Sequence, residues 1–167
     1  MSSEVIIRGA VEADVPEIAR IYNHAILNTT STFDVEPKSI DDRLAWFRDR
    51  SGAHPVIVAT VDGEVAGWAE IKPFGTRQAY QHTVENAVYV DPAYQGKGIG
   101  SSLLDKLLRL ATERGFHVVL ALIVAGNECS VRLHTKFGFE HVGTMGEVGR
   151  KFDKWLDLLV FEKKLNS

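Results

Sequence analysis

The stretch from Val88 to Leu104 constrains the fold of this chain more than any other segment. An apolar run ending at Val90 predicts a strand, Asp91-Pro92 predicts a turn, and glycines at positions 96, 98 and 100 lead into an amphipathic helix. Glycine lacks a Cβ, so it adopts backbone angles that other residues avoid and lets a ligand approach the main chain. The first amides of a helix have no intrahelical acceptor and carry partial positive charge. The segment is therefore either a phosphate-binding loop or a glycine-rich turn without a ligand.

Length and composition bound the organisation of the chain. Its 167 residues suit one domain, residues 1–167, which can bury a core without disulfide or metal support. The net charge of -3 offers no broad attraction for nucleic acid or anionic membranes, so any phosphate site must be local. The single cysteine, Cys129, indicates a reducing compartment. Because the chain shows no secretory leader and no apolar run of ~20 residues, we expect a cytoplasmic protein without a membrane segment.

Hydrophobic periodicity predicts a sheet flanked by helices. Short apolar or alternating runs predict strands at residues 5–7, 55–61, 64–71, 83–90, 118–123 and 155–165, with one more beginning near Phe139. Apolar positions at helical spacing predict four helices, which begin near Asp14, Ser39, Gly100 and Asn127. Asp14 and Ser39 are expected to cap their helices. The fold class is therefore α/β or α+β, with a mixed sheet and helices on both faces.

The order of the motifs separates the glycine loop from other nucleotide-binding loops. Gln95, Gly98 and Gly100 follow a strand in the middle of the chain, and Asn127 opens a later helix. A Rossmann loop instead follows the first strand of its domain, and the Gly-Lys-Ser/Thr sequence of a P-loop is missing. The pattern resembles the Gln/Arg-x-x-Gly-x-Gly/Ala signature of the GNAT superfamily of acetyl-CoA-dependent N-acetyltransferases. This resemblance implies a GNAT fold, with a central mixed, mostly antiparallel sheet of six to seven strands and about four helices.

A more specific resemblance covers nearly the full length. The segment at residues 77–90 is similar to that of phosphinothricin acetyltransferases, as are Phe33 with Glu36-Pro37 and the segment at residues 149–157. Methionine sulfone and methionine sulfoximine acetyltransferases share these features. One position departs from the pattern: herbicide-resistance members have a Trp-Lys pair where this chain has Phe74-Gly75. The missing lysine leaves open whether phosphinothricin itself is a substrate.

The resemblance implies acetyl-CoA as co-substrate and no metal. Main-chain groups of residues 88–90 would pair with the pantetheine arm and polarise the thioester, and the amides of residues 95–101 would cradle the pyrophosphate. Lys97 would add charge, or is only solvated, and Asn127 would contact the pantetheine or only cap its helix. The expected cofactor-binding residues are Val88, Tyr89, Val90, Gln95, Gly96, Lys97, Gly98, Ile99, Gly100, Ser101, Asn127 and Ser130.

Two residues are expected to take part in proton transfer. Glu85 matches the family position of the general base, and partial burial in its strand would raise its pKa toward the working pH. His134 stands where many GNAT enzymes have a tyrosine acid, and the phosphinothricin branch also has histidine there. It would protonate the departing thiolate, or it is a packed side chain near the cofactor.

The acceptor is expected to be a small amino acid, whose carboxylate requires cations. Arginine is well shaped for carboxylates, so Arg77 is favoured together with the aromatic Tyr80. The full set of expected substrate-binding residues is Phe33, Lys72, Pro73, Phe74, Arg77, Tyr80, Glu85, Asn86 and Lys151. The resemblance also implies a homodimer that binds neither nucleic acid nor membranes. The alternatives are an acetyltransferase of proteins or peptides and a catalytically idle acetyl-CoA-binding module.

Overall fold

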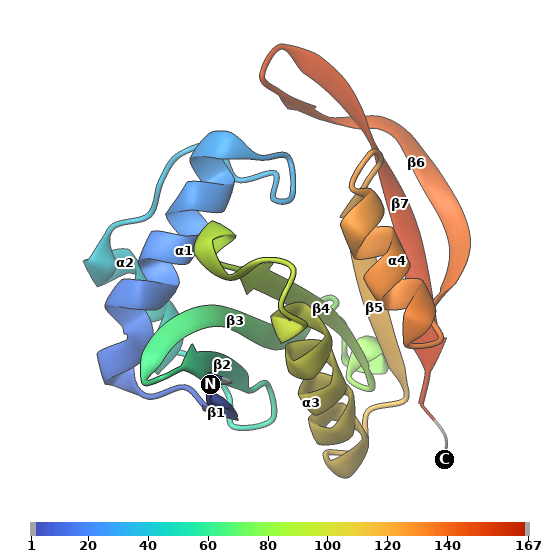
Figure 1. Cartoon of the computed structure of the whole chain (residues 1–167). Helices are drawn as coiled ribbons and strands as arrows, with labels where there is room; N and C mark the ends of the chain where they lie inside the picture. Colours follow the sequence, from blue (N-terminus) through green and yellow to red (C-terminus); the bar gives the residue numbers. More distant parts are fainter. Residues whose placement is uncertain (1–2, 166–167) are drawn as a thin grey trace.

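The computed structural model describes residues 3–165, and its central feature is one seven-stranded sheet (Figure 1). The strands are β1 (Val5–Gly9), β2 (Val56–Val61), β3 (Glu64–Pro73), β4 (Thr83–Val90), β5 (Val118–Val124), β6 (Glu140–Lys151) and β7 (Lys154–Lys164). Their order across the sheet is β1-β2-β3-β4-β5-β7-β6. Every neighbouring pair is antiparallel except β4 and β5. The expected mixed, mostly antiparallel sheet is confirmed.

Four helices flank the sheet, as the periodicity predicts. They are α1 (Val15–Asn28), α2 (Ile40–Arg48), α3 (Ile99–Glu113) and α4 (Glu128–Lys136). Helices α1 and α2 pack on one face around Trp68, whereas α3 packs on the other face through Leu103, Leu104 and Leu107. In residues 3–165 no helix combines the length and apolar character needed to cross a bilayer.

The two predicted helix caps have different outcomes. The Ser39 hydroxyl accepts from the Asp42 amide at 3.0 Å, so the cap of α2 is confirmed. The expected side-chain cap of α1 by Asp14 is wrong, although Asp14 does stand at the N-cap position. Its carboxylate accepts from the Val11 amide at 2.8 Å and from Arg8 at 2.7 and 2.9 Å. The preceding turn and an arginine compete successfully for the oxygens that would have capped the helix.

The parallel pair in the middle of the sheet is short. Pairing between β4 and β5 covers only three positions and ends where Glu85 lies opposite Leu120, although both strands continue. Beyond this point the strands diverge, and we call the point of divergence the fork. Main-chain groups on the β5 side of β4 are therefore not used by the sheet after Glu85. This interruption positions the candidate site.

Candidate active site

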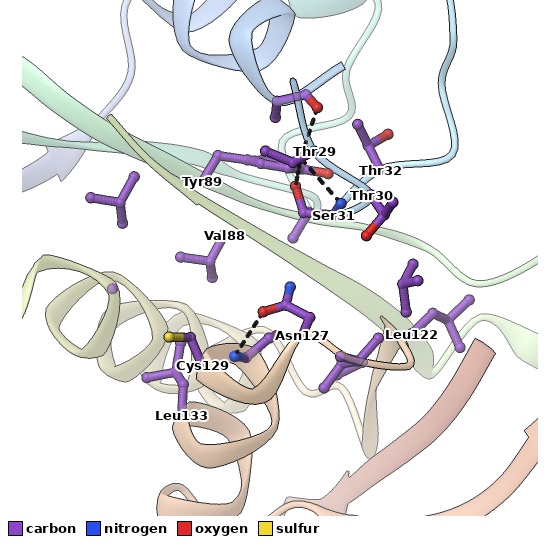
Figure 2. A pocket seen from close by; sticks show the side chains of 18 of the residues that line it. Thr29, Thr30, Ser31, Thr32, Val88, Tyr89, Leu122, Asn127, Cys129 and Leu133 are labelled. Carbon is purple, nitrogen blue, oxygen red and sulfur yellow. Dashed lines mark hydrogen bonds between the residues drawn. The ribbon is translucent and has the colours of Figure 1, made fainter. Parts of the chain in front are cut away.

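A cleft of about 1150 Å³ opens at the fork. Its walls come from the end of α1 with the loop at residues 29–34, from β4, from the glycine loop, and from the end of β5 with the start of α4. Figure 2 shows Thr29, Ser31 and Tyr89 on one side and Asn127 and Leu133 on the other. Segments far apart in sequence thus converge on one cavity.

The glycine loop lies at one end of the cleft. Gly98 is the N-cap residue of α3 and has φ +78°, a left-handed conformation that favours glycine. A Cβ built at Gly98 meets no protein atom within 4 Å, so the main chain faces open space. Arg20 donates to the Asp91 carboxylate at 2.8 Å, and this carboxylate also accepts from the Ala93 amide at 2.9 Å, so both contacts fix the turn before the loop. The loop therefore has the geometry of an anion site at a helix N-terminus, and Arg20 and Asp91 fix the turn from which it begins.

Glu85 lies on β4 at the fork and lines the cleft. Its side chain is 19% exposed, and Oε1 lies 3.8 Å from Nζ of Lys72, directly opposite on β3. Burial raises the pKa of Glu85, while the Lys72 ammonium opposes part of that increase. A half-buried carboxylate with a raised pKa is suited to accept a proton from an amine.

His134 is buried, with 4% of its surface exposed, and is held on both sides. Nδ1 lies 2.8 Å from the Ser130 carbonyl oxygen, and Nε2 lies 3.2 Å from Oδ1 of Asn86. The Asn86 amide in turn donates to the Leu120 carbonyl oxygen at 3.2 Å, at the fork. Burial lowers the pKa of His134. Both nitrogens face acceptor oxygens, and a neutral ring donates to only one of them. This network spans both diverging strands and α4.

Asn127 combines the two roles considered for it. Its side chain accepts from the Ser130 amide at 3.3 Å and so caps α4, as Figure 2 shows. Asn127 and Ser130 also line the cleft. A helix cap and a ligand contact are therefore compatible at this position.

The structure places the remaining cofactor and substrate residues unevenly. Most of the expected cofactor residues line the cleft, but Lys97 and Ser101 do not. Phe33, Lys72, Glu85 and Asn86 line it as well. Outside the lining lie Pro73, Phe74, Arg77, Tyr80 and Lys151.

Two of these outlying groups have other contacts. Phe74 and Tyr80 pack edge to face with ring centroids 5.0 Å apart, and both rings are exposed. Lys151 is buried, and Nζ donates to the Thr32 carbonyl oxygen at 2.8 Å. Lys151 therefore ties the end of β6 to the loop at residues 29–34.

Apart from Phe33, the residues of the loop at 29–34 were not predicted to form a wall of the site. The hydroxyls of Thr29 and Ser31 lie 2.7 Å apart near the cleft, and the Tyr22 hydroxyl bonds to Thr32 and Asp34 below it. Burial and the bond to Asp34 raise the pKa of Tyr22 to about 12. The available signal was a run of four hydroxyl residues directly after an amphipathic helix.

Comparison with known proteins identifies the family of this chain. The profile of the acetyltransferase (GNAT) family matches residues 18–139, a span that includes the glycine loop and Glu85. The chain belongs to the GNAT family of acetyltransferases. This GNAT chain is therefore an acyltransferase by family, and the matched span includes the glycine loop.

Relatives that match over nearly the full length show which GNAT enzymes this chain is similar to. The chain is 41% identical to the L-amino acid N-acyltransferase MnaT of Escherichia coli, over 96% of this chain and 94% of that protein. It is 40% identical to the L-methionine sulfoximine/L-methionine sulfone acetyltransferase of Salmonella typhimurium, over 96% and 95%. A GNAT phosphinothricin acetyltransferase from Sinorhizobium meliloti, solved in complex with AcCoA, superposes with a TM-score of 0.94 at 34% identity, over 99% and 90%. The relatives match in both fold and length.

Proposed function

We propose that this enzyme transfers the acetyl group of acetyl-CoA to the α-amine of a small amino acid or analogue, with Glu85 as general base. The observation that carries the proposal is the half-buried Glu85 carboxylate facing a cleft that ends at a helix-start anion cradle. Relatives named for amino-acid, methionine sulfoximine and phosphinothricin acylation support the substrate class.

The residues present fit acetyl-CoA. At Gly98 the left-handed backbone and the open space beside it leave room for a phosphate against the first amides of α3. Beyond the fork, the main chain of residues 88–90 is free to pair with an extended pantetheine arm as an added strand would. Asn127 lies across the cleft from Val88, so the pantetheine arm would lie between the two residues (Figure 2).

Bound acetyl-CoA would supply an acetyl group activated as a thioester. Glu85 accepts a proton from the substrate ammonium, directly or through one water, so that the amine nitrogen can attack the carbonyl carbon. A main-chain N–H of residues 88–90 donates to the carbonyl oxygen as negative charge develops there. The new C–N bond forms, the C–S bond breaks, and the sulfur leaves as a thiolate, which takes up the second proton of the amine directly or through water. His134 is not required for this step, because a thiol with a pKa of about 8.5 is a competent leaving group.

A panel of acceptors tests the function. Release of free thiol from acetyl-CoA should accelerate with L-methionine sulfoximine, L-methionine sulfone, phosphinothricin or common amino acids, but not with peptides. Turnover of peptides alone would support the protein acetyltransferase, and binding of acetyl-CoA without any turnover would support an idle module. Either result would refute the proposal.

A pair of variants tests the base. Glu85→Gln should lower kcat, with the dissociation constant for acetyl-CoA nearly unchanged, because the amide cannot accept the proton. Glu64→Gln, at the exposed turn between β2 and β3, is the matched control and should retain wild-type kinetics. Equal rates for Glu85→Gln and wild type across the pH range would remove Glu85 as base.

The same proposal includes a cytoplasmic homodimer that forms through the β6–β7 arm, which projects past the rest of the sheet in Figure 1. Five large apolar side chains on this arm are exposed by 42–61% of their surface. They are Val142, Met145, Val148, Phe152 and Trp155. Light scattering of wild type and of Trp155→Ser tests this: a wild-type monomer at micromolar concentration would refute the dimer.

A further inference from the structure

The pair formed by Lys72 and Glu85 is loose and faces the cleft. The two residues lie opposite each other on β3 and β4, and both line the cavity. Nζ of Lys72 lies 3.8 Å from Oε1 of Glu85, which is longer than a hydrogen bond. The lysine side chain is 42% exposed, whereas the glutamate side chain is 19% exposed. The lysine is thus the partner that can move, and the carboxylate is the fixed one.

The pair has the charge pattern that complements a free amino acid. In such a molecule the amine nitrogen and the carboxylate carbon are separated by about 2.5 Å, because only the α-carbon lies between them. An amine within hydrogen-bond reach of Glu85 therefore brings its own carboxylate next to the Lys72 ammonium. The amine of a peptide N-terminus or of a lysine side chain carries no such neighbouring carboxylate.

We infer that Lys72 exchanges partners during substrate binding, leaving Glu85 for the α-carboxylate of the incoming amino acid, and so selects free amino acids over peptides. The inference rests on the proposed function and specifies its substrate class. It also links recognition to chemistry, because the cation that stabilises the Glu85 carboxylate leaves only when a carboxylate-bearing acceptor arrives.

The charged groups around Glu85 determine how the departure of Lys72 changes the pKa of Glu85. Lys72 lowers the pKa of Glu85, so its departure raises that pKa and makes the carboxylate a stronger proton acceptor. Glu70, also on β3, acts in the same direction as burial and is itself 3.4 Å from Arg50. Across the cleft, Tyr22 and Asp34 bond to each other. Lys72 is therefore the charged neighbour that lowers the pKa of the base.

The first experiment uses a matched pair of acceptors, an amino acid that the wild type acetylates and its α-carboxamide. Lys72→Met should lower kcat/KM for the amino acid roughly 10- to 100-fold, as expected for losing a hydrogen bond to a charged group, and should leave the value for the carboxamide almost unchanged. Lys72→Arg should retain the preference for the amino acid. Arg109→Met is the control, because it removes an exposed ion pair, Arg109 to Asp105 at 3.0 Å, whose two residues both lie outside the cleft lining.

The second experiment separates partner exchange from simple charge attraction. The pH dependence of kcat/KM reports the free enzyme, and that of kcat reports the substrate complex. Lys72→Met should move the acidic limb of kcat/KM to higher pH but leave the acidic limb of kcat for the amino acid in place, because Lys72 has already left Glu85 in the complex.

The outcomes discriminate clearly. An equal loss for both acceptors, no loss for either, or an equal shift of both pH limbs would overturn the exchange. A wild type that acetylates no amino acid while it binds acetyl-CoA would overturn the proposed function instead. Acetyl-CoA affinity and thermal stability of Lys72→Met establish that the variant is folded.

Discussion

A single methyl group at Gly98 should separate backbone strain from ligand binding. Gly98 and Gly115 stand at opposite ends of α3 with φ +78° and +80°, and a Cβ at either position meets no atom within 4 Å. Alanine in this left-handed conformation costs about 1–2 kcal/mol. For a chain of this size that corresponds to a fall in Tm of roughly 2–4 °C per kcal/mol. Gly98→Ala and Gly115→Ala should therefore destabilise the apoprotein by similar amounts.

The two variants should differ once acetyl-CoA is added. Only Gly98 faces the cleft, where a methyl group would occupy the approach of a phosphate to the first amides of α3. Losing one hydrogen bond to a charged group costs about 1.5–3 kcal/mol, which is roughly a 10- to 100-fold loss of affinity. At a ligand concentration of 100 times the wild-type Kd, binding stabilises the fold by about 2.7 kcal/mol, whereas a 100-fold weaker variant gains only about 0.4 kcal/mol.

Thermal shift measurements with and without acetyl-CoA give the readout. Gly115→Ala should retain a rise of roughly 5–11 °C, whereas Gly98→Ala should show about 1–2 °C for a 100-fold loss of affinity and about 3–6 °C for a 10-fold loss. Isothermal titration calorimetry checks the affinities directly. The same ligand-dependent rise in both variants would refute the assignment of the glycine loop as the pyrophosphate cradle.

Three further outcomes are expected. Because burial raises the pKa of Glu85, the folded state binds the carboxyl proton more tightly than the unfolded chain, and the stability that this proton contributes is lost as the pH rises through the folded pKa. Glu85→Gln should therefore be more stable than wild type at pH 7 in urea unfolding, and the difference should disappear at acidic pH. His134→Phe and Asn86→Leu should each raise the KM for acetyl-CoA. Because the two side chains share one contact, the KM of the double variant should be no higher than that of the more severe single variant. Additive effects on the alkaline limb of kcat would instead indicate that His134 is a general acid. Gly149→Ala places its Cβ against the Phe33 ring, closer than van der Waals contact, and should cost about 1–3 kcal/mol in thermal unfolding, with a raised KM for the amino acid and an unchanged Kd for acetyl-CoA.

Local patterns were enough to predict most of the fold. The strand at residues 83–90 and the helix after the glycine loop have the expected positions because their apolar spacing and glycines act within a few residues. The failure at Asp14 is also local in origin, since two donors compete for one carboxylate. Motif order then placed the glycine loop, Glu85 and Asn127 around one cleft.

Contacts between distant segments were beyond such patterns. Lys151 donates to the carbonyl oxygen of Thr32, a residue 119 positions away, and no periodicity encodes that approach. Arg77 and Tyr80 follow the end of β3, so the cross-strand pairing of Lys72 with Glu85 leaves them beyond the cleft wall. Residue type suggested cations and aromatic rings for the acceptor, but strand register decides which of them face the cavity.

Strand register also explains how Glu85, the proposed base, could act on a thioester bound beside the glycine loop. Side chains alternate along β4, so Val84, Val88 and Val90 pack toward α3, whereas Tyr89 packs toward α1 and α2. Glu85 shares the face of Tyr89, on the side opposite to α3. An amine that enters on the α1 face would not reach a thioester held on the α3 face through an intact sheet. The fork removes the intervening strand pairing, and the link from His134 through Asn86 to the Leu120 carbonyl oxygen spans it at that point. A shift of one residue in β4 would exchange the faces of Glu85 and Asn86, so the contact that spans the fork also fixes the face on which the proposed base lies.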